Sequence, residues 1–195
     1  MLKFKKIKGN FVHPTAVINW KSLVIGKGNT IGPYVVIGNQ AQWKNKKNSG
    51  KIIIGNRNVF NEYTNIHLPT TLKKKTYIGN DNYFMNSTTV DHDCYIEDNV
   101  TLSSGVVLGG NVYLMKYSNL GIKTIIHQNQ VIGSYSMVGM GTIITKNKII
   151  KPGFVYYGKP AKLMKKNNFI IKKLKIDKNN LIKETQRFKK IKREI

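Results

Sequence analysis

A large aliphatic residue or a phenylalanine recurs at every sixth position from Ile54 to Ile150. A helix repeats every 3.6 residues and a strand every two, so neither requires a strict spacing of six. A chain that turns a corner every six residues does require it, because each corner sends one side chain into a shared axial core. The series therefore predicts an all-β fold, a parallel β-helix of hexapeptide repeats. Its members are Ile54, Phe60, Ile66, Leu72, Ile78, Phe84, Val90, Ile96, Leu102, Leu108, Leu114, Leu120, Ile126, Ile132, Val138, Ile144 and Ile150.

Three hexads form one triangular coil of about 18 residues. A weaker start precedes the strict series and lengthens the predicted stack to about seven coils. This start consists of Val12, Ile18, Ile25, Ile31 and Ile37. The period fails over residues 39–50 (NQAQWKNKKNSG), a polar segment that ends in glycine and predicts a projecting loop.

The hexads stop after Gly158, and the composition changes there. Residues 159–195 are rich in lysine, and their apolar residues recur at near-helical spacing after Asp177, a candidate N-cap. We therefore expect a β-helical domain over residues 1–158, which includes the projecting loop, and a basic helical tail over residues 159–195.

The formal net charge of +24 raises the question of nucleic-acid binding. Of the 33 basic residues only three are arginine, and the lysines are scattered along the chain. Base recognition relies on arginine and on exposed stacking aromatics, neither of which the pattern indicates, so nucleic acid is disfavoured. A basic surface suits phosphorylated or acidic partners better.

A single cysteine excludes an internal disulfide. The N-terminal sequence MLKFKKIKGNF lacks an apolar stretch long enough for a signal peptide or a membrane span, so a cytoplasmic protein is expected.

Counting in steps of 18 places residues on one face of the helix. Positions 72, 90, 108, 126 and 144 should stack on the same side of successive coils, about 4.8 Å apart. Polar residues follow three of these anchors: Asp91, His92 and Asp93; Gly109, Gly110 and Asn111; His127 and Gln128. The same count assigns His67 to a different face, because it follows Ile66.

Each candidate also has a structural interpretation. His92 lies between two carboxylates and next to the Gly-Gly segment, which favours a catalytic role, whereas His127 fits a solvated corner equally well. His13 fits chain entry before a proline, Cys94 fits core packing, and Lys73–Lys75 fit a solvated face. The histidine spacings match no metal-ligand set, so no metal site is expected.

The segments FVHPTAVI, NIHLPTT, HDC, LGGNV and IIHQNQVIG together resemble the left-handed β-helix acyltransferases that act on sugars, including those of lipid A biosynthesis. The resemblance covers residues 11–187. It implies left-handed coils, a homotrimer, and active sites in the clefts between subunits.

By the same resemblance, His92 is the general base, with a neighbouring carboxylate, Asp93, to orient it, and the Gly110 N–H binds the oxyanion. Substrate or donor contacts are expected for His127, Gln128, His67, Asn111, Asp91, Met140, Lys146 and Lys162. Asn111 and Thr89 replace histidines of the family. Met140 lies where the lipid A enzymes carry a glycine that measures the acyl chain, and the ending GKPAK (residues 158–162) resembles CoA-dependent acetyltransferases.

The expected function is transfer of a short or medium acyl group, most simply acetyl, from a CoA thioester to a hydroxyl or amine of a nucleotide-activated sugar. No cofactor is expected to be bound permanently. One alternative is a lipid A type enzyme with a hydroxyacyl carrier protein as donor. The other is a non-catalytic β-helix scaffold.

Overall fold

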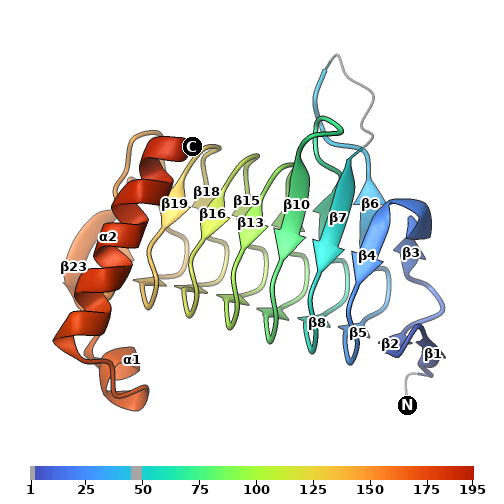
Figure 1. The fold of residues 1–195 in the computed structure, drawn as a ribbon, viewed down its shortest axis with the longest axis horizontal. Helices are drawn as coiled ribbons and strands as arrows, with labels where there is room; N and C mark the ends of the chain where they lie inside the picture. Colours follow the sequence, from blue (N-terminus) through green and yellow to red (C-terminus); the bar gives the residue numbers. More distant parts are fainter. Residues whose placement is uncertain (1–2, 45–49) are drawn as a thin grey trace.

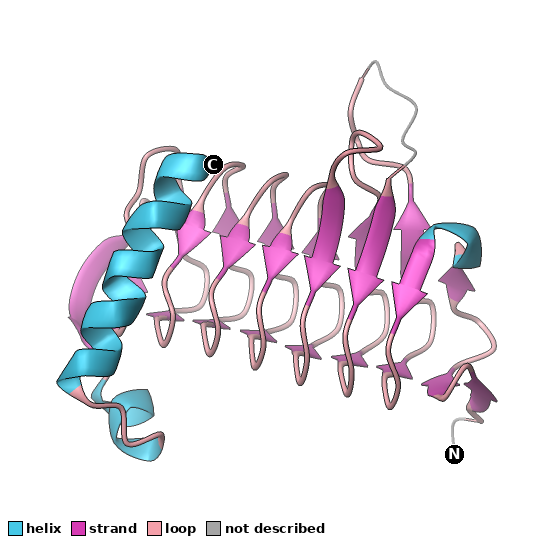
Figure 2. Ribbon diagram, in the orientation of Figure 1, coloured by secondary structure: helices cyan, strands magenta, loops and turns pink. Residues whose placement is uncertain are grey.

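The computed structural model describes residues 3–44 and 50–195. They form a left-handed parallel β-helix, in which short strands stack into three sheets along one axis (Figure 1). Strands, turns and the C-terminal helices are distinguished by colour in Figure 2. The predicted fold class is thus confirmed.

Each sheet receives one strand from every coil, so strands that follow one another in sequence lie in different sheets, except in the antiparallel pair at each end of sheet A. Sheet A contains β1 (Lys5–Ile7), β2 (Asn10–Val12), β5 (Thr30–Ile31), β8 (Val59–Phe60), β11 (Tyr83–Phe84), β14 (Thr101–Leu102), β17 (Asn119–Leu120), β20 (Met137–Val138), β22 (Phe154–Tyr157) and β23 (Lys162–Lys166). Sheet B contains β3 (Val17–Ile18), β6 (Val36–Asn39), β9 (Asn65–His67), β12 (Thr89–Val90), β15 (Val107–Leu108), β18 (Ile125–Ile126) and β21 (Ile143–Ile144). Sheet C contains β4 (Leu23–Ile25), β7 (Lys51–Ile54), β10 (Lys75–Ile78), β13 (Tyr95–Ile96), β16 (Tyr113–Leu114) and β19 (Val131–Ile132). A 3-10 turn, η1, covers Trp20–Ser22.

The hexad anchors fill the axial core, where nearly all of them are completely buried. Phe60 and Phe84 stack in adjacent coils with ring centroids 4.7 Å apart. One anchor of the predicted series is wrong, because Leu72 is 76% exposed.

The reason is an insertion in the third coil. Ile54 pairs with Ile78, and Ile66 pairs with Val90, so each pair is 24 residues apart where 18 were expected. The segment between β9 and β10 is six residues longer than in a regular coil and forms a loop outside the β-helix. Because six residues equal one hexad, the spacing of apolar residues in the sequence is not interrupted. His67 consequently follows the same sheet edge as Asp91 and His92, and the prediction that it belongs to a different face is wrong.

The predicted loop 39–50 begins at the end of β6 and leads to β7. Its residues 45–49 lie outside the described part of the chain. This loop and the six-residue insertion both leave the corner between sheets B and C, in consecutive coils.

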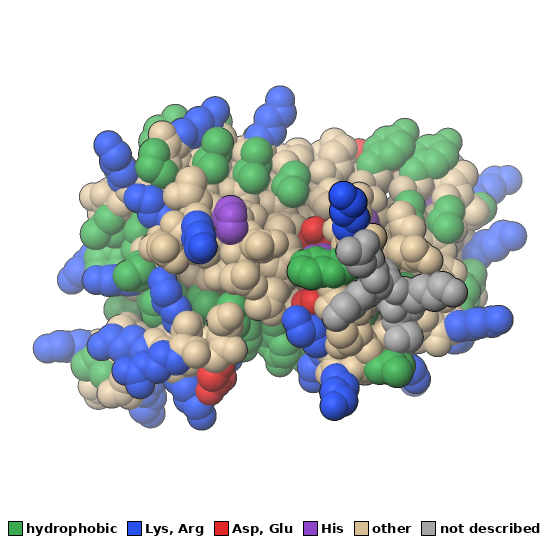
Figure 3. Space-filling view, turned by 90° about the horizontal axis from the view of Figure 1, so that it is seen from above, with side chains coloured by type: hydrophobic (Ala, Val, Ile, Leu, Met, Phe, Trp, Pro, Cys, Tyr) green, Lys and Arg blue, Asp and Glu red, His purple; other side chains and the backbone are tan. Residues whose placement is uncertain are grey.

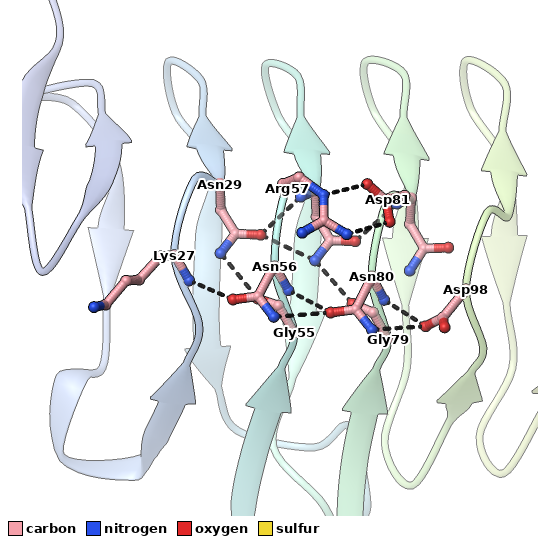
Figure 4. Close-up of polar contacts among 11 residues, drawn as sticks. Lys27, Asn29, Gly55, Asn56, Arg57, Gly79, Asn80, Asp81 and Asp98 are labelled. Carbon is pink, nitrogen blue, oxygen red and sulfur yellow. Dashed lines mark hydrogen bonds and ion pairs between the residues drawn. The ribbon is translucent and has the colours of Figure 1, made fainter.

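Asparagine side chains build a ladder along the corner between sheets C and A (Figure 4). Asn58 Oδ1 accepts the Asn82 N–H at 2.9 Å, and Asn58 N donates to Asn29 Oδ1 at 2.8 Å. An outer row ends where Asp98 Oδ1 accepts from the Asn80 main chain at 2.6 Å. These bonds satisfy main-chain donors that the sharp corner leaves without strand partners.

The tail contains α1 (Asn168–Lys173) and α2 (Lys178–Glu194). Asp177 caps α2, as predicted, by accepting from Asn180 N at 2.7 Å. Phe188 and Ile191 of α2 pack against Met115 and Val131. β22 and β23 form a hairpin across the proposed domain boundary at residue 158. Within the described residues, no helix combines the length and the apolar character that a membrane span requires.

Candidate active site

The predicted base, His92, lies in the turn that joins β12 to β13. It is 7% exposed, and its Nδ1 lies 2.9 Å from Asp93 Oδ2. Asp93 adopts a left-handed conformation with φ +63°, which non-glycine residues rarely do. A carboxylate on Nδ1 fixes the tautomer that leaves Nε2 free to accept a proton.

The six-residue insertion holds Asp93 in turn. Thr70 donates to both of its carboxylate oxygens, from N at 3.0 Å and from Oγ1 at 2.7 Å, and Lys74 Nζ lies 3.4 Å away. Burial alone would raise the pKa of Asp93, but the bonds from Thr70 and His92 and the charge of Lys74 together lower it. Asp93 therefore stays a carboxylate. For Lys74, the interpretation as part of a solvated face is incomplete, since its ammonium group approaches the site.

Gly110 lies directly beneath the imidazole of His92. A Cβ at position 110 would collide with Cε1, Nε2 and Nδ1 of that ring, so only glycine fits. Gly110 is buried, and among the hydrogen bonds of residues 3–44 and 50–195 none uses its N–H. A buried main-chain donor without a partner, next to a histidine, is the arrangement that binds an oxyanion.

These groups open into a pocket of about 300 Å³. Trp43, from the loop after β6, places its ring edge-to-face with His92 at a centroid distance of 5.5 Å. Asn111 and Gln128 also line the pocket, and their substrate contacts stay predictions. Figure 3 looks onto this corner and shows acidic side chains beside an apolar one, with many basic side chains toward the periphery.

Two predicted residues lie behind the pocket wall. Asp91 Oδ1 is 3.2 Å from His67 Nδ1 and accepts from the His92 main chain at 2.8 Å. His67 is only 1% exposed. Within one chain, His67 therefore supports the site from inside and does not line the pocket.

The remaining predicted residues do not converge on His92 in a single chain. His127 is exposed, and its Nδ1 lies 3.0 Å from the carbonyl oxygen of Gln128. Met140 is 65% exposed. Lys146 and Lys162 are exposed as well and do not line the pocket. Their roles stay predictions that require a second subunit.

Cys94 occupies the core, as the packing interpretation predicted. Burial raises the pKa of its thiol to about 12, so the nucleophilic thiolate does not form near neutral pH. In residues 3–44 and 50–195, no three His, Cys, Asp or Glu side chains are grouped so that they could hold a metal ion.

Sequence reasoning missed three contributors to the site, namely Trp43, Thr70 and Lys74. All three belong to the two loops that leave the corner between sheets B and C. Pro69 within the third coil was a possible sign of the insertion, because proline interrupts strand pairing.

Comparison with known proteins agrees with the fold. Residues 75–110 match the family described as bacterial transferase hexapeptide (six repeats). An acyl-[acyl-carrier-protein]–UDP-N-acetylglucosamine O-acyltransferase of Burkholderia ambifaria is 37% identical over 106 residues, which are 53% of this chain and 40% of that protein. The chain thus matches less than half the length of this relative.

Two solved structures share the architecture. The UDP-N-acetylglucosamine acyltransferase of Bacteroides fragilis superposes with a TM-score of 0.82 at 24% identity, over 91% of this chain and 69% of that one. The acetyltransferase domain of PglB from Neisseria gonorrhoeae gives a TM-score of 0.51 at 22% identity, over 80% and 57% of the two chains. At such identities these structures support the fold alone. In its fold and in the sequence of its central coils, this chain resembles the left-handed β-helix acyltransferases with hexapeptide repeats.

Proposed function

We propose that this chain is an acyltransferase that moves an acyl group from a thioester to a hydroxyl of a nucleotide-activated sugar. One observation carries the proposal. A buried His92–Asp93 pair lies on Gly110, whose N–H makes no hydrogen bond among the described residues. General base and oxyanion donor are thus side by side, with a pocket in front of them.

The reaction needs only these groups. His92 Nε2 removes the proton of the acceptor hydroxyl, whose oxygen attacks the thioester carbonyl carbon. The Gly110 N–H stabilises the resulting oxyanion, a contact typically worth about 3 kcal/mol. Collapse of the tetrahedral intermediate breaks the carbon–sulfur bond, and the leaving thiolate takes the proton from His92. Asp93 stabilises the imidazolium that forms between these two steps.

The names of the relatives support UDP-N-acetylglucosamine as acceptor and an acyl carrier protein as donor. The net charge of +24 favours an acidic donor of this kind. This support favours the carrier protein over acetyl-CoA. The CoA donor stays the alternative, for which the GKPAK ending and Met140 argue.

A homotrimer completes this proposal. The pocket beside His92 is open to solvent, and His127 lies outside it, two coils further along the helix. Exposed apolar side chains follow the neighbouring surface of sheet B and its corner with sheet A; they are Val107, Ile122, Ile125 and Met140. A second copy packed there would supply the missing wall and cover these side chains.

Thiol release is the direct test. The purified protein is mixed with UDP-N-acetylglucosamine and with hydroxyacyl carrier protein or acetyl-CoA. We expect release from the carrier protein and a loss of about 10²–10⁴ in kcat for His92→Ala. The control Cys94→Ser should retain most of the activity. Release from acetyl-CoA alone would support the alternative donor, and no release with any donor or sugar would support a scaffold. Light scattering that gives 22 kDa would refute the trimer.

A further inference from the structure

We propose that His67 and Asp91 are positioning residues, which hold the main chain of His92 in the place that general-base catalysis requires. This inference rests on the proposed function of the site. It assigns the second histidine–aspartate pair of the chain to a role different from substrate contact.

The chain of contacts is continuous. Asp91 Oδ1 is shared between His67 Nδ1, at 3.2 Å, and the His92 N–H, at 2.8 Å. His67 is buried in β9, whose strand pairing fixes it one coil before the site. The turn that carries His92 is thereby tied to a rigid strand of the neighbouring coil.

A second link runs through Thr76. Its Oγ1 donates to the His67 carbonyl oxygen at 3.0 Å and accepts from Asp93 N at 3.2 Å. Main-chain N–H groups on both sides of the His92 side chain are therefore held from the coil that contains His67. Residues 91–94 lie between β12 and β13; main-chain bonds from Asp91 N to Leu108 O and from Asn111 N to His92 O tie this turn to the following coil, and the bonds through Asp91 and Thr76 tie it to the preceding one.

The charge state of Asp91 agrees with this role. Burial opposes ionisation, but the bonds from His67 and from the His92 main chain outweigh it and lower the pKa of Asp91. A permanent carboxylate accepts both hydrogen bonds at once. The imidazole itself is hydrogen-bonded to the other carboxylate, Asp93.

His67 makes no other polar side-chain contact within the described residues. Its Nε2 is buried without a hydrogen-bond partner there. A histidine kept for substrate binding would expose this nitrogen to the pocket, but His67 is not among the pocket-lining residues. Only Nδ1 of His67 makes a polar contact, so a side chain that donates a hydrogen bond from the same place should restore its role.

The substitutions His67→Leu and Asp91→Ala test the role. We expect each to lower kcat by about 10- to 100-fold with little change in KM, because a displacement of about 1 Å costs this much in a positioned site. His67→Asn should recover most of the rate, since an asparagine amide can donate from nearly the position of Nδ1. The double variant should lose no more than Asp91→Ala alone, because Asp91 transmits the effect of His67.

A readout independent of turnover separates positioning from activity. Hydrogen exchange is measured on peptides that cover residues 89–95. We expect exchange to accelerate at least tenfold in His67→Leu and Asp91→Ala, and to stay close to wild type in His67→Asn. The matched control is Thr64→Val. Thr64 lies in the same coil as His67, and the substitution removes a buried 3.1 Å contact with Thr88 of the next coil; it should change neither exchange nor kcat.

Wild-type exchange in His67→Leu, or a kcat equal to that of Thr64→Val, would overturn the inference. An inactive wild type with accelerated exchange in His67→Leu would instead refute the proposed function, while the positioning of the turn would stand.

Discussion

Replacing Gly110 with alanine should change the position of the His92 ring without a large change in the stability of the fold. The added Cβ would overlap three atoms of the His92 ring. Gly110 does not have a positive φ, so the alanine backbone is not strained and the collision alone acts. The imidazole has to move away by about 1 Å or more to reach ordinary contact.

The size of the loss follows from the displaced base. A displacement of about 1 Å in a positioned group costs about 10²-fold in rate. Since the main chain at position 110 is not strained, its N–H keeps its direction, and we expect kcat to fall by about 10²-fold. Stability should change little, because the ring faces a pocket into which it can turn.

The assay measures kcat together with thermal unfolding. Gly79→Ala is the matched control, since its Cβ would collide with the Asp98 carboxylate at the corner between sheets C and A, far from His92. It should lower the melting temperature and leave kcat close to wild type. Near-normal kcat in Gly110→Ala would show that His92 is not the base.

Three further outcomes are expected. Met140→Gly should shift kcat/KM toward longer chains, measured with acetyl, butyryl, decanoyl and tetradecanoyl thioesters, because each buried methylene contributes about 0.8 kcal/mol; an unchanged profile would mean that Met140 does not limit the chain. The lowered pKa of Asp93 contributes stability that is complete above the ordinary carboxyl pKa of about 3.9 and is lost as the pH falls through the lowered pKa. Asp93→Asn should therefore reduce the free energy of unfolding at pH 7 and approach wild type in strong acid; a constant difference at all pH values would contradict this linkage. Asn58→Ala should destabilise by about 2–4 kcal/mol in urea unfolding, since it leaves the buried Asn82 N–H and the Gly79 carbonyl oxygen without their ladder partner; a loss below about 0.5 kcal/mol would show that water replaces these bonds.

The fold could be predicted because every coil repeats the same six-residue spacing of buried apolar side chains. Ile78, Val90 and Leu108 follow a rule that local sequence enforces, since a polar residue there would be buried in the axis. Leu72 has the spacing of a hexad anchor in the sequence, but its side chain is exposed in the structure. An insertion of six residues is invisible to a period of six, and only pairing between coils reveals it.

The site could be predicted only where the period places it. His92, Asp93 and Gly110 follow anchors of the regular coils, so their meeting required no knowledge of loops. Thr70 and Trp43 reach the site through irregular segments, whose path depends on packing that no repeat specifies. His127 and Met140 lie at the outer surface, where a single sequence does not show what covers them.

Both breaks in the repeat occur at one corner, in the coils directly before the one that carries His92. A regular coil places side chains about 4.8 Å apart on a flat face, which cannot enclose a substrate. The two loops that leave that corner bring Thr70 to Asp93 in the next coil and Trp43 to His92 two coils further on. The repeat thus fixes where His92 and Gly110 lie, while the two insertions supply the contacts to Asp93 and to the His92 ring. Changes within residues 39–50 or 68–74 should therefore alter activity far more than stability, whereas changes at the hexad anchors should do the opposite.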